Sequence, residues 1–270
     1  MNFLLAVGAH SEGGVLTDPS LPVTDIEAQI DALGFGYGRT FGIAGRSANM
    51  ALAAPYVHLD ASGNIGENRA SVSREGVGDT KLRFAMNLFG APAMTPREFA
   101  QREPKTTLGA SLTVNIPTGE YDPDKLVNIG TNRWAAKAEL GLTYPRGKWM
   151  LETYLGAWFF ADNGDFFGGQ KREQDPLTSI QAHVSYTFKP RLWLALNTTY
   201  YFGGQTTIDG IHKQDRQSNS RAGLTFSMPV GNRYSIKLSW SRGATTRIGS
   251  NFTNYGASLQ YAWMDKPSRP

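Results

Sequence analysis

The sequence predicts an all-β protein: one transmembrane, antiparallel, up-and-down β-barrel of about 12 strands, with short periplasmic turns and long extracellular loops. Two observations predict it. Segments in which apolar and polar residues alternate recur from one end of the chain to the other, and successive side chains of a strand point to opposite faces of a sheet. The links between these segments are mostly short and long in turn, as they are in outer-membrane barrels.

Composition and charge limit what these strands can build. The chain has 270 residues, which suits a single barrel domain over 1–270, although two small soluble domains would also fit. No stretch approaches the roughly 20 continuous apolar residues of a membrane-spanning helix, so a helical membrane protein is excluded. The net charge of +4 comes from scattered Lys and Arg, without the basic stripe of a nucleic-acid-binding surface. The absence of Cys is typical of an exported β protein that needs no disulfide.

The alternation predicts about twelve strands, and most of them reach the roughly 9 to 11 residues that a tilted strand needs to cross a bilayer. The strands are centred, in chain order, on residues 3–9, 25–41, 47–59, 80–89, 106–116, 134–144, 149–160, 179–188, 192–202, 221–228, 234–242 and 252–263.

The lengths of the links distinguish the two rims of the barrel, one with short turns and one with long loops. Links 41–46, 145–148, 189–191 and 229–233 are short, whereas 161–178 and 203–220 are long and polar. The exception is 90–105, which falls on the short-turn rim and yet is long. Its Thr95 followed by Pro96 resembles an N-cap with Pro at the first helical position. We therefore expect a short periplasmic helical insertion at 90–105, and a C-terminal tail at 264–270.

Residues paired across a hairpin must point to the same face, which allows the register to be predicted. We expect Tyr144 opposite Trp149, Phe188 opposite Leu192 and Met228 opposite Tyr234. The second of these pairings places His183 opposite Asn197.

The cost of charge then gives each face a direction. A basic side chain that faces lipid costs about 2 to 4 kcal/mol at the midplane, so the charged faces are expected inside and the apolar faces outside. A soluble sandwich that buries the apolar faces is the alternative. The side chains expected to line the lumen or its constriction are Glu27, Asp31, Arg83, Lys137, Glu139, Glu152, His183, Asn197, Arg221 and Lys237. The aromatic side chains expected to offer stacking surfaces inside are Tyr154, Trp158, Trp193 and Tyr201.

Several segments carry a resemblance to a known family. They are RSANMALAAPYV (46–57), LFGAPAMTPREF (88–99), GEYDPDKLVNIGTNRWAAKAELG (119–141), WFFADNGDFFGG (158–169) and RQSNSRAGLTFSMPVG (216–231). In these the chain resembles a family of outer-membrane transporters named for the meta-cleavage pathway of phenol degradation. The resemblance implies a barrel that passes small, often aromatic or hydrophobic, compounds, and it brings no catalytic residues with it.

The residues offer little catalytic chemistry. The four His residues have no metal-ligand spacing, so we expect no metal and no cofactor. His183 is either a polar wall residue or, with Ser185 or Asn197, part of a hydrolytic site; the inward direction of Ser185 argues against a lipid hydrolase. Gly34, Gly36 and Gly38 are expected to let a strand bend or an opposite side chain fit. The loop carboxylates at 122–124 and 162–165 are either turns or calcium ligands.

The favoured function is passive passage of small molecules across the outer membrane of a Gram-negative bacterium, without enzymatic activity. A barrel hydrolase and a closed structural or adhesive barrel are the alternatives. The expected partners are outer-membrane lipid, small-molecule solutes and the barrel-assembly machinery, to which the C-terminal strand presents alternating apolar residues up to Trp263. The charged lumen residues either form an ion-pair network that fills the barrel or a constriction that selects solutes. A secretion signal is expected to lie outside this sequence, because residues 1–7 lack a basic region and a cleavage site.

Overall fold

The computed structural model describes residues 1–16, 23–95, 98 and 101–264. Within these residues the main sheet has 13 strands, of which β4 pairs with β3 alone, so the remaining twelve form the barrel. They are β1 (Asn2–Leu16), β2 (Val23–Ile43), β3 (Arg46–Ile65), β5 (Thr80–Phe89), β6 (Thr107–Ile116), β7 (Ala135–Arg146), β8 (Trp149–Phe160), β11 (Leu177–Lys189), β12 (Leu192–Gly203), β15 (Gln217–Val230), β16 (Tyr234–Thr245) and β17 (Gly249–Trp263).

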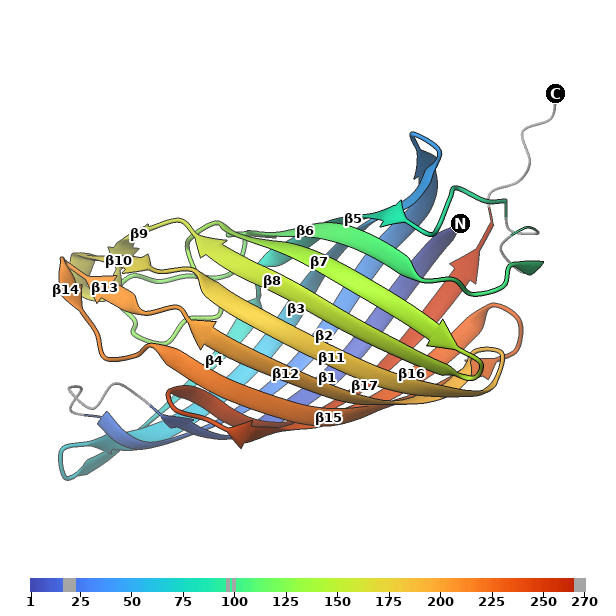
Figure 1. Ribbon diagram of the computed structural model, residues 1–270. Coiled ribbons are helices and arrows are strands. Elements are labelled where there is room, and N and C mark those ends of the chain that lie inside the picture. Colours follow the sequence, from blue (N-terminus) through green and yellow to red (C-terminus); the bar gives the residue numbers. More distant parts are fainter. Residues whose placement is uncertain (17–22, 96–97, 99–100, 265–270) are drawn as a thin grey trace.

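The twelve strands close into an up-and-down antiparallel barrel, and the predicted fold class is confirmed (Figure 1). Each strand pairs with its neighbours in the ring; β1 pairs with both β2 and β17, and β2 pairs with β3, which closes the cylinder. Asn2 lies opposite Trp263, so the first and last strands meet at the rim of short turns. In the part of the chain that the structure describes, no helix is long and apolar enough to cross a membrane.

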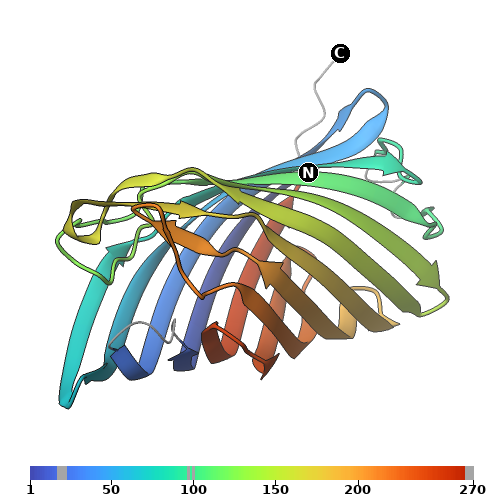
Figure 2. The same cartoon turned by 60° about the vertical axis from the view of Figure 1, so that its left-hand side comes forward.

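Strands that the alternation did not predict lie at the rim of long loops. β4 (Asn68–Val77) extends the wall by pairing with the far half of β3. A separate small sheet contains β9 (Asn163–Phe166), β10 (Gln170–Gln174), β13 (Thr206–Ile208) and β14 (Ile211–His212), and the 3-10 turn η1 (Phe167–Gly169) joins the first two of these. Figure 2 shows β1 to β4 as a tall wall on one side of this rim. The loop strands have two to five residues, too few for alternation to identify.

Two of the three predicted hairpin registers are wrong by two residues. Arg146 rather than Tyr144 lies opposite Trp149, and Val230 rather than Met228 lies opposite Tyr234. Both turns are therefore tighter by two residues, which leaves every side chain on its predicted face. In the third hairpin, Lys189 lies opposite Leu192, and a bulge absorbs the one-residue difference, so His183 does lie opposite Asn197.

The outer face is apolar around the barrel. Phe35 on β2 is 68% exposed, and large apolar side chains are similarly exposed on the outer faces of the other strands. Trp149 and Tyr186 pack edge to face at 4.9 Å near the short-turn rim, and Tyr234 and Tyr261 contact each other at 4.9 Å on the same rim. An apolar belt with aromatic residues at its edge is the exterior of a transmembrane barrel. The soluble-sandwich alternative is wrong, because these faces would form its buried core.

Glu27 and Asp31 are a correction: both lie on the outer face, not in the lumen. Asp31 shares its face of β2 with Leu33 and Phe35, and its Oδ1 lies 2.7 Å from Nδ1 of His10. Asp31 lies twelve residues before Ile43, the last residue of β2. This separation is about 40 Å along the strand and, because the strands tilt by 35 to 45°, about 28 to 33 Å along the barrel axis. This exceeds the apolar band of about 25 Å, so the cost of facing lipid does not apply to it.

The segment at 90–105 lies against the short-turn rim. Ala93 donates its N–H to the carbonyl of Gly45 at 2.9 Å, in the turn between β2 and β3. Thr95 N–H and Oγ1 donate to Glu98 Oε2 at 2.7 and 2.8 Å, and Glu98 N–H donates to Thr95 Oγ1, the reciprocal pattern of a capping box. The predicted helix itself falls largely on residues 96–97 and 99–100, outside the described residues, as does most of the tail at 264–270.

The lumen as candidate functional site

The polar wall of the lumen is built from alternate residues of β5 to β8, β11, β12, β15 and β16. The pairing carries one face from strand to strand: Arg83 pairs with Thr113, Thr113 with Lys137, and Lys137 with Trp158. The structure places Arg83, Lys137, Glu139, Glu152, His183, Asn197, Arg221 and Lys237 on this inner face, with Tyr154, Trp158, Trp193 and Tyr201. Their part in transport stays a prediction.

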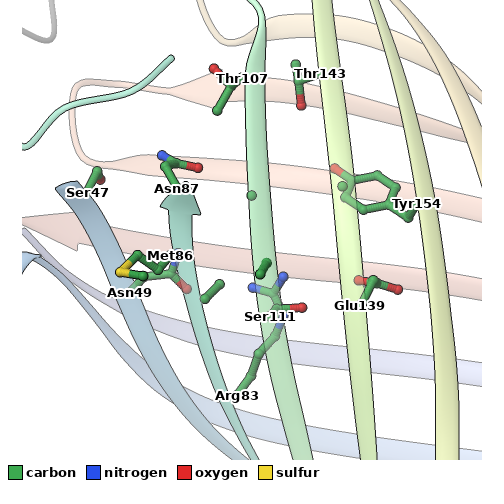
Figure 3. A pocket seen from close by; sticks show the side chains of 14 residues that line it. Ser47, Asn49, Arg83, Met86, Asn87, Thr107, Ser111, Glu139, Thr143 and Tyr154 are labelled. Atoms are coloured by element: carbon green, nitrogen blue, oxygen red, sulfur yellow. The ribbon is translucent and has the colours of Figure 1, made fainter. Parts of the chain in front are cut away.

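Glu139 is the centre of the first cluster on this wall. Its carboxylate forms an ion pair with Lys137 and accepts a hydrogen bond from Nε2 of Gln181 at 2.8 Å. The two charged side chains are only 14% and 13% exposed, because they lie flat against the wall. Both come from β7, two residues apart, so the ion pair runs along the wall rather than across the lumen. Figure 3 shows Glu139 and Tyr154 on neighbouring strands, with Arg83 beside them.

Glu152 and His183 form a second cluster nearer the short-turn rim. The hydroxyl of Tyr154 donates to Oε1 of Glu152 at 2.9 Å, and the ring of Tyr154 meets that of His183 edge to face at 5.6 Å. Nδ2 of Asn197 donates to Oγ1 of Thr225 at 3.0 Å. Oδ1 of Asn197 therefore faces His183 and accepts a hydrogen bond from its Nδ1 at 2.8 Å. The side chain of His183 is thereby fixed as a link in a chain of polar contacts along the wall.

This arrangement does not form a hydrolytic site in the described part of the chain. Ser185 lies two residues from His183 on the same strand and pairs with Ala195 and Met150. The hydrogen bond of His183 goes to Asn197, whereas a serine nucleophile needs its general base within hydrogen-bond reach. The geometry fits a polar wall residue.

Two cavities open beside these clusters. The larger has a volume of about 550 Å³ and is lined by Arg83, Glu139, Glu152, His183 and Trp193, among others. The smaller, of about 160 Å³, continues past Arg83 and Glu139 to Asn49 and Thr107 (Figure 3). A space of several hundred cubic ångströms accommodates a single-ring solute. Arg83, Glu139 and Tyr154 line both cavities.

Without Glu27 and Asp31, the charged side chains predicted inside carry a net positive charge. Of the charged side chains predicted inside, the four cations Arg83, Lys137, Arg221 and Lys237 remain, and only the two carboxylates Glu139 and Glu152 oppose them. The excess within this predicted set is two positive charges, and Lys81 lies on the same inner face of β5 as Arg83. The ammonium of Lys237 also lies 5.7 Å from the ring centre of Trp193, a cation–π contact on the inner wall.

The opposite wall of the lumen is apolar, which the sequence analysis missed. The inner faces of β1, β2 and β3 carry Leu5, Val7, Ile30, Val57 and Leu59, all partly exposed. The signal was present in the sequence, because residues 3–9 and 52–57 are apolar on both faces, unlike the strict alternation of later strands. Gly38 on this wall makes room for an opposite side chain, as predicted: a Cβ there would lie 2.7 Å or less from three ring atoms of Phe3.

The mouth on the long-loop side holds two partly buried arginine side chains. Arg133 lies 4.6 Å from the ring centre of Phe160, and Arg172 lies 5.4 Å from that of Phe166. Burial, together with the nearby positive charge of Arg172, lowers the pKa of Arg133 to about 10. Arg133 also donates a hydrogen bond to Gln174 of β10, so it ties the small loop sheet to the barrel mouth.

The loop carboxylates form ion pairs and hydrogen bonds with neighbouring loop residues. Asp122 Oδ2 lies 2.7 Å from Nζ of Lys125, and its Oδ1 accepts the N–H of Asp124 at 3.0 Å. Asn163, 2% exposed, bonds through its side chain to Asn132, Tyr121 and the N–H of Asp165. These contacts fit the turn interpretation rather than a calcium site. Within the described residues, no group of three or more His, Asp or Glu side chains is arranged to hold a metal.

Comparison with known proteins identifies relatives of this architecture. The family model described as "Putative MetA-pathway of phenol degradation" matches residues 10–261. No curated protein sequence matches the chain. An outer membrane channel from Pseudomonas putida F1 has a TM-score of 0.83 at 20% sequence identity, covering 96% of this chain and 94% of that chain.

Two other solved barrels are more distant. The transport unit of the autotransporter AIDA-I from Escherichia coli has a TM-score of 0.54 at 9% identity, covering 97% of this chain and 90% of its own. The KdgM porin has a TM-score of 0.51 at 8% identity, covering 96% and 99%. At these identities the likeness establishes the barrel fold alone.

Proposed function

The chain belongs to this phenol-degradation family, and on that premise we propose that it is an outer-membrane channel for the passive uptake of small, aromatic or hydrophobic molecules into a Gram-negative cell. One observation carries the proposal. An apolar belt surrounds a polar inner wall whose cavities lie beside, and are not filled by, the ion pair of Lys137 and Glu139. A barrel whose lumen keeps space for solute next to its charged groups is built for passage.

The alternatives fit the inner wall less well. A closed structural barrel would be favoured by charged side chains that meet across the lumen, whereas the Lys137–Glu139 pair lies along one strand. A hydrolase would need a nucleophile bonded to His183, whose described hydrogen bond goes to Asn197. The names of the similar structures, a channel and a porin, support the channel assignment by analogy.

Liposome swelling tests the proposal. Vesicles that contain the purified, folded barrel are placed in isosmotic solutions of uncharged solutes of increasing size, with protein-free vesicles as the control. We expect swelling that slows as solute size increases, and no change in esterase or phospholipase activity when His183→Ala is compared with the wild type. Vesicles that do not swell for any solute would overturn the proposal, and hydrolysis that His183→Ala abolishes would favour the enzyme.

A further inference from the structure

We infer that the lumen selects amphipathic anions, namely small carboxylates that carry an aromatic or other apolar body. The inference rests on the proposed channel function and names its solute class. It comes from the two-sided lining of the barrel: an apolar wall on β1 to β3, flanked at both edges by cationic side chains.

The apolar wall is continuous across three strands. Leu5 and Val7 of β1 pair with Gly36 and Gly34 of β2, and Ile30 of β2 pairs with Leu59 of β3. All of these side chains point inward, and Leu5, Val7, Ile30 and Leu59 are partly exposed, so they present apolar surface to whatever occupies the lumen. On the β2 side, the glycines opposite Leu5 and Val7 add no side chain to this wall, which leaves it flat there.

Cationic side chains border the apolar wall on each side. On one edge, Arg83 of β5 pairs directly with Ala51 of β3. On the other edge, Lys237 of β16 pairs with Ser258 of β17, which in turn pairs with Val7 of β1. The row from Lys237 through Ser258 to Val7 therefore runs from a positive charge to the apolar wall within three neighbouring strands.

Only one class of solute uses both surfaces. A neutral ring compound gains contact with the apolar wall but has no charge to pair with the cations, and a small inorganic anion has a charge but no apolar body for the wall. An organic cation is repelled by the net positive lumen. A carboxylate attached to an apolar body places its charge beside Arg83 or Lys237 and its body on the apolar wall, and the binding remains weak enough for the solute to leave.

Bi-ionic reversal potentials in planar bilayers measure this preference directly. The probes are benzoate, acetate and protonated benzylamine, each compared with chloride or potassium across the same membrane. We expect benzoate to be more permeant than acetate, and both to be several-fold more permeant than protonated benzylamine. Conducting channels in which benzylamine permeates as well as benzoate would overturn the inference and leave the channel function intact. A bilayer that conducts no ion at all would overturn the channel function.

Three variants separate the two surfaces. Val7→Thr combined with Val57→Thr keeps side-chain shape and is expected to lower the permeability ratio of benzoate to acetate. The matched control is Val184→Thr, the same substitution on the outer face of β11, which is expected to leave that ratio unchanged. Arg83→Gln is expected to lower the ratio of benzoate to benzylamine. Equal ratios in the wild type, the double variant and Arg83→Gln, with all proteins folded by their heat-modifiable gel migration, would contradict the inference.

Discussion

The buried carboxylate of Asp79 joins the 117–134 loop to the junction between β4 and β5. Only 8% exposed, it lies where β4 ends and β5 begins, and it accepts hydrogen bonds from Gly119 N–H at 3.0 Å, Thr131 N–H at 3.1 Å and Thr131 Oγ1 at 2.6 Å. The 117–134 loop is thereby held against the barrel. A carboxylate with three donors cannot be replaced by an apolar group without leaving those donors unpaired.

We expect Asp79→Ala to destabilise the folded barrel by about 1 to 3 kcal/mol, the cost of buried donors left without partners. Urea unfolding in lipid vesicles, followed by Trp fluorescence, measures this change. Asp124→Ala on the same loop is the control, because Asp124 is exposed, and surface substitutions stay within about 0.5 kcal/mol. Equal effects of the two substitutions would show that the Asp79 contacts do not hold the loop.

The glycines of β2 differ in the space available to them. A Cβ on Gly38 would enter the ring of Phe3, whereas a Cβ on Gly34 would meet Val7 at 3.8 Å, an ordinary contact. Gly38→Ala is expected to cost about 1 to 3 kcal/mol by overpacking, and Gly34→Ala less. The same unfolding experiment compares them, and Phe3→Leu in the Gly38→Ala background should restore part of the loss. An equal cost at both positions would contradict the assigned packing.

At the scale of elements, alternation predicted the strands well because a lipid-facing surface requires it. β5 and β8 coincide with their predicted ranges. β4 escaped because its outer face is polar: Arg69, Ser71, Ser73 and Glu75 stand beyond the apolar belt, where no apolar residue is required. The error for Glu27 and Asp31 has the same origin. The cost argument that turns charges inward holds only within the hydrocarbon, whereas β2 extends beyond it at Glu27 and Asp31.

Hairpin register was the second limit of the sequence. Matching faces restrict the pairing to alternate registers but do not choose between turns that differ by two residues. Gly147 and Gly231 both adopt positive φ in the observed turns, at 60° and 62°, and a turn that places Gly at such a position is the physical reason for the tighter hairpins. The apolar inner wall of β1 to β3 was missed for another reason, since a strand that is apolar on both faces does not indicate which face meets lipid.

The chain contains no Cys, so single cysteines can report the depth of β2. Asp31→Cys is expected to react with a membrane-impermeant maleimide added to intact cells, because this outer-face position lies beyond the belt. Phe35→Cys, on the same face four residues nearer the short-turn rim, is expected to react only after detergent dissolves the membrane. Equal labelling of both positions in intact cells would contradict the assigned height of the belt.

At the scale of the whole molecule, the outer surface and the lumen of the barrel each have an apolar part and a polar part. Its outer surface is apolar within the membrane and polar on the parts of β1 to β4 that extend beyond it, where His10 and Asp31 interact. Its lumen is apolar along β1 to β3 and polar elsewhere. The location and the fold followed from the sequence, because lipid imposes one pattern on every strand. The character of the lumen did not, because it depends on which side chains of different strands face each other across the ring.

Single-channel recording tests the central claim, that this barrel is an open passive channel, most directly. Purified, folded protein is inserted into planar bilayers in symmetrical potassium chloride, and insertion is verified by recovering the heat-modifiable barrel from the membrane. The account predicts stepwise currents that are linear in voltage and persist without any energy source. Bilayers that contain the folded barrel and yet conduct no more than protein-free bilayers would contradict it.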